Sequence, residues 1–283
     1  MTQISNSPAA EISRRLEVAI SAGKEAGRLT LNYFQQDNYQ VERKSDASPV
    51  TIADRSSEQL LRERIAAAFP QDGVLGEELG TTTGTSGFTW ILDPIDGTKS
   101  FISGVPLYGT LIGIEHQGRA LAGFVYLPAL GEGIYGSAGQ GAWYFRGDQP
   151  PRRCRVSAKS RLADGLFVTS EINTFDQRGA MRVFEALQKA AWLTRTWGDC
   201  YGYLLVATGR AELMVDPIMN VWDAAAIQPI IEEAGGTFTD WKGNPTIRGG
   251  EGIATNGLVL DEVLAIMQPS KSEAPLRSPS RQL

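Results

Sequence analysis

Hydrophobic side chains recur every three or four positions near the start of the chain, and the same spacing returns around residue 60. The first set runs from Ile12 to Phe34 and the second from Leu60 to Phe69, where Pro70 follows directly. This spacing places one apolar stripe along a helix, and proline ends a helix because it has no amide hydrogen to donate. The pattern predicts two long amphipathic helices that bury their stripes in the core.

Short apolar runs take over in the next part of the chain. One is Phe88–Leu92, and two more, residues 111–115 and 120–126, flank a glycine-containing turn at 116–118. Runs of this length bounded by turn residues are typical of β-strands, and a short turn joins antiparallel neighbours. We therefore expect a hairpin-rich antiparallel sheet. Residues 80–87, rich in Thr, Gly and Ser, are expected to form an irregular loop before it.

Strand-like and helix-like segments alternate beyond residue 150, including one expected helix over residues 222–234. Such alternation predicts an α/β section. We therefore expect an N-terminal α+β domain over residues 1–150, with the helix pair and the antiparallel sheet, and a C-terminal α/β domain over residues 151–268. Residues 269–283 are rich in Ser, Pro and Arg and predict a disordered tail.

Composition excludes several classes of protein. The 283 residues carry 27 Lys and Arg against 32 Asp and Glu, a formal net charge of −5, which does not favour a nucleic-acid partner. With one histidine, His116, and two distant cysteines, Cys154 and Cys200, imidazole or thiolate metal sites and a disulfide framework are not indicated. The start of the chain lacks a secretory pattern, and no apolar run reaches about eighteen residues, so we expect a cytoplasmic protein without a membrane partner.

Two carboxylates three positions apart supply the strongest chemical signal. Asp93 and Asp96 surround Pro94 and Ile95 at the end of a predicted buried strand, and Gly97 follows. Proline fixes φ and glycine permits a reversal, so the turn can direct both carboxylates and the Ile95 carbonyl into one space. Such hard oxygen donors favour Mg²⁺ or Mn²⁺. The same residues also suit an ordinary turn in which the carboxylates cap backbone amides.

Two more acidic residues stand in comparable settings, because Glu77 follows a short apolar segment and Asp223 opens a predicted helix. Taken singly, Glu77 suits a solvated loop and Asp223 an ordinary helix cap. Gly97 and Thr98 stand where another helix would begin, and free amides at a helix start bind phosphate. Together these segments predict a metal site beside a phosphate site.

The elements Gly76–Glu78, Trp90–Thr98 and Trp222–Ala225 resemble, in order and spacing, those of the inositol monophosphatase family of Mg²⁺-dependent phosphatases. The resemblance extends from about Ile12 to Met267. It implies an α/β (α+β) fold, a layered α-β-α-β-α sandwich. It also implies a homodimer that hydrolyses a small-molecule phosphate monoester with two or three Mg²⁺ ions, Mn²⁺ being possible.

The resemblance also implies roles for individual residues. The implied metal ligands are Glu77, Asp93, the Ile95 carbonyl, Asp96 and Asp223. The implied catalytic pair that activates water is Asp54 with Thr98. The residues expected to bind substrate are Glu77, Gly97, Thr98, Asp199, Cys200 and Asp216.

The segments 196–203 and 215–217 resemble the histidinol-phosphate phosphatase branch more than the inositol-phosphatase branch. Histidinol phosphate carries an ammonium group, which prefers carboxylates such as Asp199 and Asp216. Inositol hydroxyls also bind carboxylates, so these residues do not decide between the substrates, and Asp199 also suits a helix N-cap. We therefore expect an L-histidinol-phosphate phosphatase, with inositol-1-phosphate as the alternative substrate.

Two other classes fit less well. A relative that only binds or regulates would have lost a metal ligand or Thr98, and none of these residues is missing. A glycosidase that used two of the carboxylates would need one acid of raised pKa and no tightly bound metal, which suits four clustered acids poorly.

Overall fold

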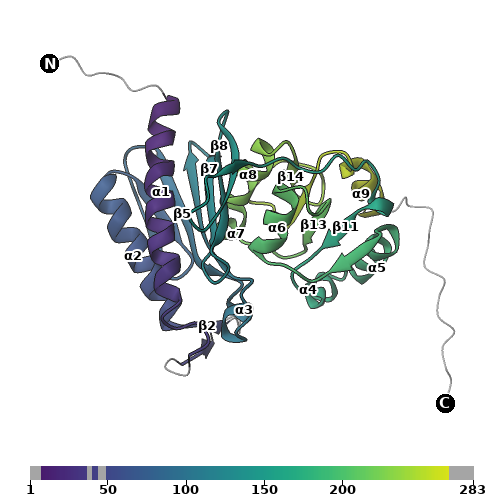
Figure 1. Ribbon diagram of the computed structural model, residues 1–283, viewed down its shortest axis with the longest axis horizontal. Helices are drawn as coiled ribbons and strands as arrows, with labels where there is room; N and C mark the ends of the chain where they lie inside the picture. The colour runs from purple at the N-terminus through teal and green to yellow at the C-terminus, as the bar shows by residue number, and fades with distance from the viewer. Residues whose placement is uncertain (1–7, 37–39, 44–48, 268–283) are drawn as a thin grey trace.

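The computed structural model describes residues 8–36, 40–43 and 49–267, and the expected tail over 269–283 lies outside them. Within these residues, helices and sheets alternate in five layers, α-β-α-β-α, as the resemblance implies (Figure 1). None of the helices in the described segments combines the length and apolarity needed to span a bilayer.

Helices and strands of the described residues keep the order of the chain. The helices are α1 (Pro8–Thr30), α2 (Ile52–Ala68), α3 (Thr98–Ile102), α4 (Ile172–Gln177), α5 (Met181–Ala190), α6 (Cys200–Ala207), α7 (Val221–Ala225), α8 (Ile227–Glu233) and α9 (Leu260–Met267), with a 3-10 turn η1 (Leu162–Asp164). The strands are β1 (Glu42–Arg43), β2 (Pro49–Val50), β3 (Gly73–Gly76), β4 (Gly80–Thr82), β5 (Phe88–Asp96), β6 (Gly109–His116), β7 (Arg119–Leu127), β8 (Glu132–Ser137), β9 (Gly141–Arg146), β10 (Arg152–Arg153), β11 (Leu166–Val168), β12 (Leu193–Arg195), β13 (Leu213–Asp216), β14 (Thr237–Thr239) and β15 (Gly252–Thr255).

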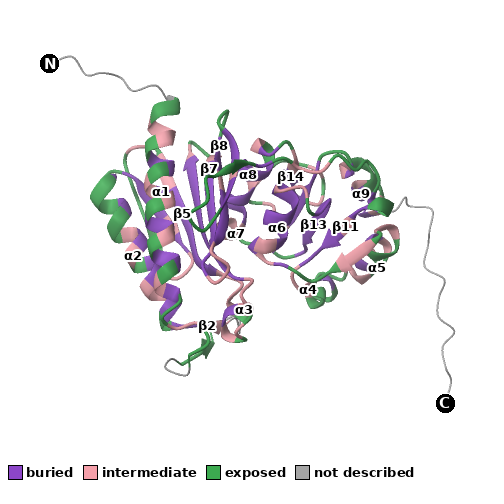
Figure 2. Cartoon of the chain, in the orientation of Figure 1, coloured by how far each residue is buried: buried purple, intermediate pink, exposed green. Residues whose placement is uncertain are grey.

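The two predicted amphipathic helices form the first layer and cover one face of an eight-stranded sheet, β10-β9-β8-β7-β6-β5-β3-β4. Figure 2 shows the division of α1 into a buried side toward the sheet and an exposed side. The helix approaches closely because Gly23 has no side chain: a Cβ there would lie 2.3 Å from the ring of Phe124. The apolar stripe therefore acts as a core face.

Antiparallel pairing dominates this sheet, which confirms the predicted hairpin-rich section, and among the strands described here only β3 and β5 pair in parallel. Two local predictions were wrong. Residues 80–82 form β4 instead of an irregular loop, because they pair with β3 and gain ladder hydrogen bonds that the local pattern does not reveal. Strand β5 also continues past Leu92 to Asp96, with an irregular register against β6 between Asp93 and Asp96.

Helices α6, α7 and α8 form the middle layer, and a five-stranded sheet, β12-β11-β13-β15-β14, follows them. The last layer consists of α4, α5 and α9 (Figure 1). The expected single helix over 222–234 is divided at Ala226. Pro229 explains the division, since it has no N–H to donate to the carbonyl of Ala225.

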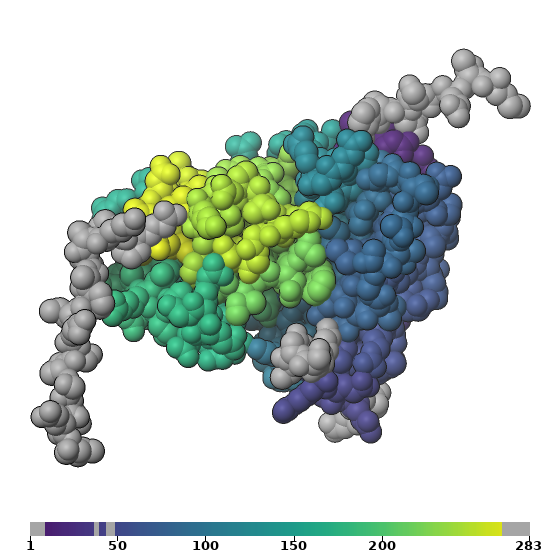
Figure 3. Space-filling view, turned by 180° about the vertical axis from the view of Figure 1, so that it is seen from behind, coloured from purple at the N-terminus to yellow at the C-terminus, as the bar shows by residue number. Residues whose placement is uncertain are grey.

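The two halves of the chain share one large hydrophobic cluster. It contains Leu111 and Val125 from the large sheet together with Leu204 and Ile230 from the middle helices. From behind, the purple-to-blue and the green-to-yellow halves meet along a broad contact (Figure 3). Strand β10 pairs with β9, so the large sheet extends just beyond residue 150, and a domain boundary there stays a prediction.

Candidate active site

A pocket of about 370 Å³ opens between the two halves, at the end of β5 and the starts of α3, α6 and α7. Ten of the eleven predicted site residues line it. They are Glu77, Asp93, Ile95, Asp96, Gly97, Thr98, Asp199, Cys200, Asp216 and Asp223. The remaining predicted residue, Asp54, is not among the described residues that line the pocket.

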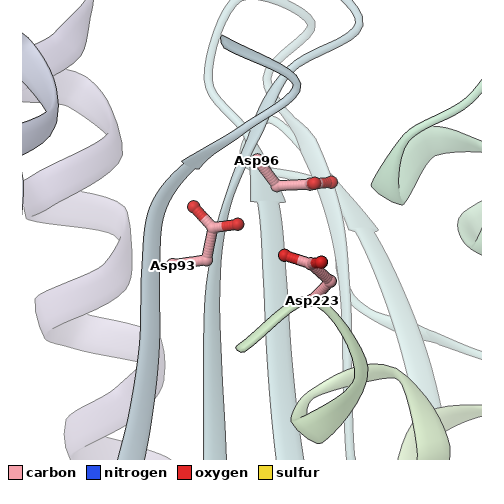
Figure 4. Close-up of side chains that lie close together, drawn as sticks. All are labelled: Asp93, Asp96 and Asp223. Carbon is pink, nitrogen blue, oxygen red and sulfur yellow. The ribbon is translucent and has the colours of Figure 1, made fainter. Parts of the chain in front are cut away.

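Three carboxylates converge in this pocket from distant parts of the sequence. Asp93 and Asp96 belong to β5 and Asp223 to α7, and one oxygen of each lies within 4.8 Å of the others. Figure 4 shows the three side chains directed toward a common space. Oxygen donors at this spacing can share one hard divalent cation.

The turn after β5 sets the direction of the first two carboxylates. Asp93 Oδ1 accepts a hydrogen bond of 3.0 Å from the amide of Ile95, which leaves its second oxygen toward the pocket. Gly97 then adopts a φ of 81°, a conformation that side chains rarely permit, and α3 begins at the next residue. The predicted turn and helix start are therefore present.

Amides from the other half of the chain hold the remaining carboxylates. Cys200 N–H, at the start of α6, donates to Asp96 Oδ2 at 2.6 Å. Asn220 N–H donates to Asp223 Oδ2 at 2.7 Å in a capping box at the start of α7. Asp223 therefore takes part in the cap of α7, the ordinary role that its sequence position suggested, and it also belongs to the carboxylate cluster.

Burial and mutual repulsion make the anionic forms of this cluster costly. Burial, followed by the charges of neighbouring carboxylates, raises the pKa of Asp93 and of Asp96 well above the usual range. Burial raises the pKa of Asp223 to about 7, against the opposing hydrogen bond from Asn220. A bound cation would relieve this repulsion, so the donor set and its charge fit a divalent metal.

Glu77 adjoins the cluster from a different strand. It follows β3, and its amide donates to the Leu92 carbonyl of β5 at 3.1 Å, which places Glu77 opposite Asp93, one position beyond the parallel pair of Gly76 and Leu92. Its carboxylate contributes to the raised pKa of Asp93. The predicted ligands Glu77, Asp93, Asp96 and Asp223 therefore face one cavity.

Thr98 and Asp54 have other partners in this structure. The Thr98 hydroxyl donates to the Ile95 carbonyl at 3.1 Å, while Asp54 Oδ2 accepts from the hydroxyl and the amide of Thr51 at 2.6 and 2.8 Å. Burial raises the pKa of Asp54 to about 6, although the bonds from Thr51 oppose this. A direct hydrogen bond between Thr98 and Asp54 is not among those of the described residues.

The predicted substrate carboxylates, Asp199 and Asp216, line the same pocket. Asp216 Oδ1 accepts from the Ser170 hydroxyl and Oδ2 from the Tyr203 hydroxyl, both at 2.7 Å. Asp199 occupies the N-cap position of α6 without making the capping hydrogen bond. Burial raises the pKa of Asp199, and it raises that of Asp216 to about 6.

Lys99 and Glu171 also line the pocket and were missed from the sequence. They form an ion pair between α3 and the start of α4, with 68% and 39% of the side chains exposed. Glu77 directly follows β3, but Glu171 comes three positions after the end of β11, so the local pattern offers no comparable signal for Glu171.

Comparisons with known proteins agree with this geometry. Residues 11–272 match the Inositol monophosphatase family. A histidinol-phosphatase of Chlorobaculum parvum is 44% identical over 253 residues, 89% of this chain and 96% of the relative. An inositol-1-monophosphatase of Rhizobium meliloti is 33% identical over 82% of this chain and 87% of the relative. The crystal structure of extragenic suppressor protein suhB from Bartonella henselae superimposes with a TM-score of 0.83 at 30% identity, covering 90% of this chain and 98% of that one.

The layered fold and the cluster of converging carboxylates define a phosphoric monoester hydrolase. The chain belongs to the inositol monophosphatase family. Enzymes of this family generally depend on a divalent metal, usually Mg²⁺, and the acidic group at Asp93, Asp96 and Asp223 can bind one.

Proposed function

We propose that this protein hydrolyses L-histidinol phosphate to L-histidinol and inorganic phosphate, with water as the nucleophile. The observation that carries the proposal is the convergence of Asp93, Asp96 and Asp223 in a pocket between the two halves. The 44% identity to a protein named histidinol-phosphatase supports the choice of substrate.

The metal-binding residues in this proposal are Glu77, Asp93, the Ile95 carbonyl, Asp96 and Asp223, which would hold two or three Mg²⁺ ions, or Mn²⁺ in their place. When bound, such ions lower the pKa of a coordinated water and stabilise the charge that develops on the leaving oxygen. Sharing of Asp93 between ions is supported by its position, because Glu77, Asp96 and Asp223 all act on its pKa.

The chain holds these carboxylates in place before any substrate arrives. Backbone amides of Ile95, Cys200 and Asn220 fix one oxygen each of Asp93, Asp96 and Asp223. Ligands with locked orientation lose less conformational entropy when they bind a metal. The amides thus pre-organise the cluster.

Thr98 and Asp54 form the proposed route for the proton that leaves the attacking water. The Thr98 hydroxyl would accept that proton while giving its own toward Asp54, which requires it to turn away from the Ile95 carbonyl that it bonds here. The raised pKa of Asp54, about 6, is suited to a proton acceptor near neutral pH.

Substrate binding is assigned to residues that line the pocket. Gly97, Thr98 and Glu77 would bind the phosphate group, and Asp199, Cys200 and Asp216 the rest of the substrate. The ammonium group of histidinol suits the carboxylates of Asp199 and Asp216, because a desolvated ammonium needs charged acceptors.

Inositol-1-phosphate is the alternative substrate. A relative named inositol-1-monophosphatase is 33% identical over most of both chains, and carboxylates also accept hydrogen bonds from neutral hydroxyls. Two further expectations remain predictions from the sequence and its resemblance, namely the homodimer and the cytoplasmic location.

The proposal is tested by measuring phosphate release from histidinol phosphate, inositol-1-phosphate and an adenosine bisphosphate, each with Mg²⁺ and with a chelator. We expect the highest kcat/KM for histidinol phosphate and loss of all activity with the chelator. Preference for inositol-1-phosphate would establish the alternative substrate. Full activity in the presence of the chelator would overturn the metal-dependent reaction itself.

A further inference from the structure

The turn that carries Glu77 is held from behind by a buried carboxylate on α2. Glu58 is fully buried, and its two oxygens accept the amides of Glu78 at 2.8 Å and Leu79 at 3.2 Å. A buried charge of this kind is costly unless it is hydrogen-bonded and paired. Glu58 is both, because Arg62 Nε donates to it at 2.8 Å.

Hydrogen bonds hold the backbone on both sides of Glu77. On one side its own amide is bonded to the Leu92 carbonyl of β5, and on the other side the next amide, that of Glu78, is bonded to Glu58. The two peptide groups that flank the Cα atom of Glu77 are therefore fixed to different elements. Its side chain leaves the backbone at one defined angle, beside Asp93.

Gly76 supplies independent evidence that this contact is tightly built. A Cβ atom at Gly76 would lie 2.0 Å from Glu58 Oε1 and 2.3 Å from its Cδ atom, so only glycine permits the carboxylate to approach the strand. The φ of Gly76 is not in the left-handed region, so the glycine is needed here for space rather than for backbone conformation.

Arg62 links the same helix to β4, the second strand of this hairpin. Its guanidinium also donates to the Gly80 carbonyl and to the Thr82 hydroxyl, both in β4. Glu58 and Arg62, one helical turn apart on α2, thus bind both ends of the turn between β3 and β4. Neither residue lines the pocket.

We infer that Glu58, supported by Arg62, is a positioning residue that sets the orientation of Glu77 toward the metal cluster. Outer groups that orient ligands typically affect metal affinity about 10- to 100-fold. The inference rests on the proposed role of Glu77 as a ligand, so its test must separate the two.

The experiment compares three full-length variants, Glu58→Gln, Glu77→Gln and Glu212→Gln. Glu212 is the matched control, because it is also a buried glutamate that accepts a backbone amide, that of Leu166 at 2.6 Å, but it precedes β13 at the end away from Asp216. Glutamine keeps the size of the side chain and replaces one acceptor oxygen with a donor that opposes the amides.

The main measurement is the affinity for Mn²⁺, read from the electron paramagnetic resonance signal of the free ion without substrate or turnover. We expect Glu58→Gln and Glu77→Gln each to weaken Mn²⁺ binding about tenfold or more, and Glu212→Gln to leave it unchanged. The Mg²⁺ concentration for half-maximal activity should rise in parallel. In Glu58→Gln, KM for the phosphate ester at saturating Mg²⁺ should stay near its parental value, which a general loss of structure would not produce.

Parental Mn²⁺ affinity in Glu58→Gln, with weakened affinity in Glu77→Gln, would overturn the positioning role and keep Glu77 as a ligand. Parental affinity in both variants would overturn the ligand role of Glu77 and the inference with it. If Glu58→Gln does not fold, Arg62→Met serves instead, since it removes the cation that supports the buried Glu58 carboxylate and the bonds from that cation to β4. Weakened Mn²⁺ binding in Arg62→Met would then support the positioning role, and unchanged Mn²⁺ affinity would overturn it.

Discussion

Asp72 and Asp93 are buried aspartates at two ends of the large sheet, with 7% and 2% of the residue exposed, but their surroundings are opposite. Asp72 directly precedes β3, and Asp93 lies near the end of β5, so the two mark opposite ends of a parallel strand pair. The carboxylate of Asp72 stabilises the fold at one end of this pair, and that of Asp93 belongs to the carboxylate cluster at the other end.

Every strong partner of Asp72 favours its anionic form. Arg15 donates to both of its oxygens at 2.8 and 3.0 Å, and Ser86 and Trp90 add bonds of 2.6 and 2.9 Å. Burial alone raises the pKa of Asp72, but these hydrogen bonds outweigh it and the pKa is lowered. Arg15 is itself enclosed, with its guanidinium 3.6 Å from the ring centroid of Phe88.

Asp93 has the opposite set of neighbours. Burial and the negative charges of Glu77, Asp96 and Asp223 all raise its pKa, and one amide hydrogen bond is its main internal stabilisation. Natural proteins tolerate such unfavourable groups where function needs them, so an uncompensated buried carboxylate marks a site and a compensated one marks a structural anchor.

The largest expected effect is on activity, from Asp93→Asn. We expect kcat to fall about 10³-fold or more, because the loss of a shared metal ligand removes several kcal/mol of transition-state stabilisation. The free energy of unfolding without Mg²⁺ should not decrease, since the substitution removes a repelled charge. Phosphate release and thermal unfolding with and without Mg²⁺ measure both quantities.

Asp93→Asn should also lose most of the increase in Tm that Mg²⁺ gives the parental enzyme, because a ligand stabilises only the state that binds it. Retained activity together with a parental Mg²⁺ shift would show that Asp93 is not shared between metals. A large drop in Tm without Mg²⁺ would break the contrast with Asp72.

The next effect is on stability, from Asp72→Asn. We expect a loss of about 3 kcal/mol in the free energy of unfolding, because Arg15 is left buried with a weakened partner. The activity of the folded fraction should remain near parental, since Asp72 does not line the pocket. Urea unfolding followed by circular dichroism, with kcat measured on the native enzyme, tests both parts.

The pH dependence of this deficit follows from the direction of the shift. The lowered pKa means that the stabilisation by Asp72 is complete above the ordinary aspartate value of 3.8 and is lost as the pH falls through the lowered pKa. The deficit should therefore be constant between about pH 5 and pH 8 and shrink in stronger acid. A deficit that instead grows in acid would contradict the assigned ionisation state.

Local patterns predicted the layers and the separate pieces of the site, because an apolar helix stripe or the end of a strand can be recognised from residues that are close in the sequence. The family resemblance supplied what local patterns could not, namely that Glu77, Asp93 and Asp223 meet. Neither source revealed the β4 pairing or the partners of Asp54, since both depend on which distant backbone groups fold against these residues. Glu58 has no signal in the sequence for the same reason.

The smallest expected effect concerns Asp216. Its surroundings are intermediate between those of Asp72 and Asp93, because the hydroxyls of Ser170 and Tyr203 donate to its two oxygens. We expect Asp216→Asn to raise KM for histidinol phosphate about tenfold, as a charge-assisted bond to the ammonium is lost. KM for p-nitrophenyl phosphate, which has no ammonium group, should change much less.

Tyr203→Phe is the matched control, because it removes one of the same hydrogen bonds and keeps the carboxylate. If Tyr203→Phe reproduces the substrate-selective effect, or if both substrates suffer equally in Asp216→Asn, then Asp216 resembles Asp72 as an anchor of the fold rather than a contact of the substrate.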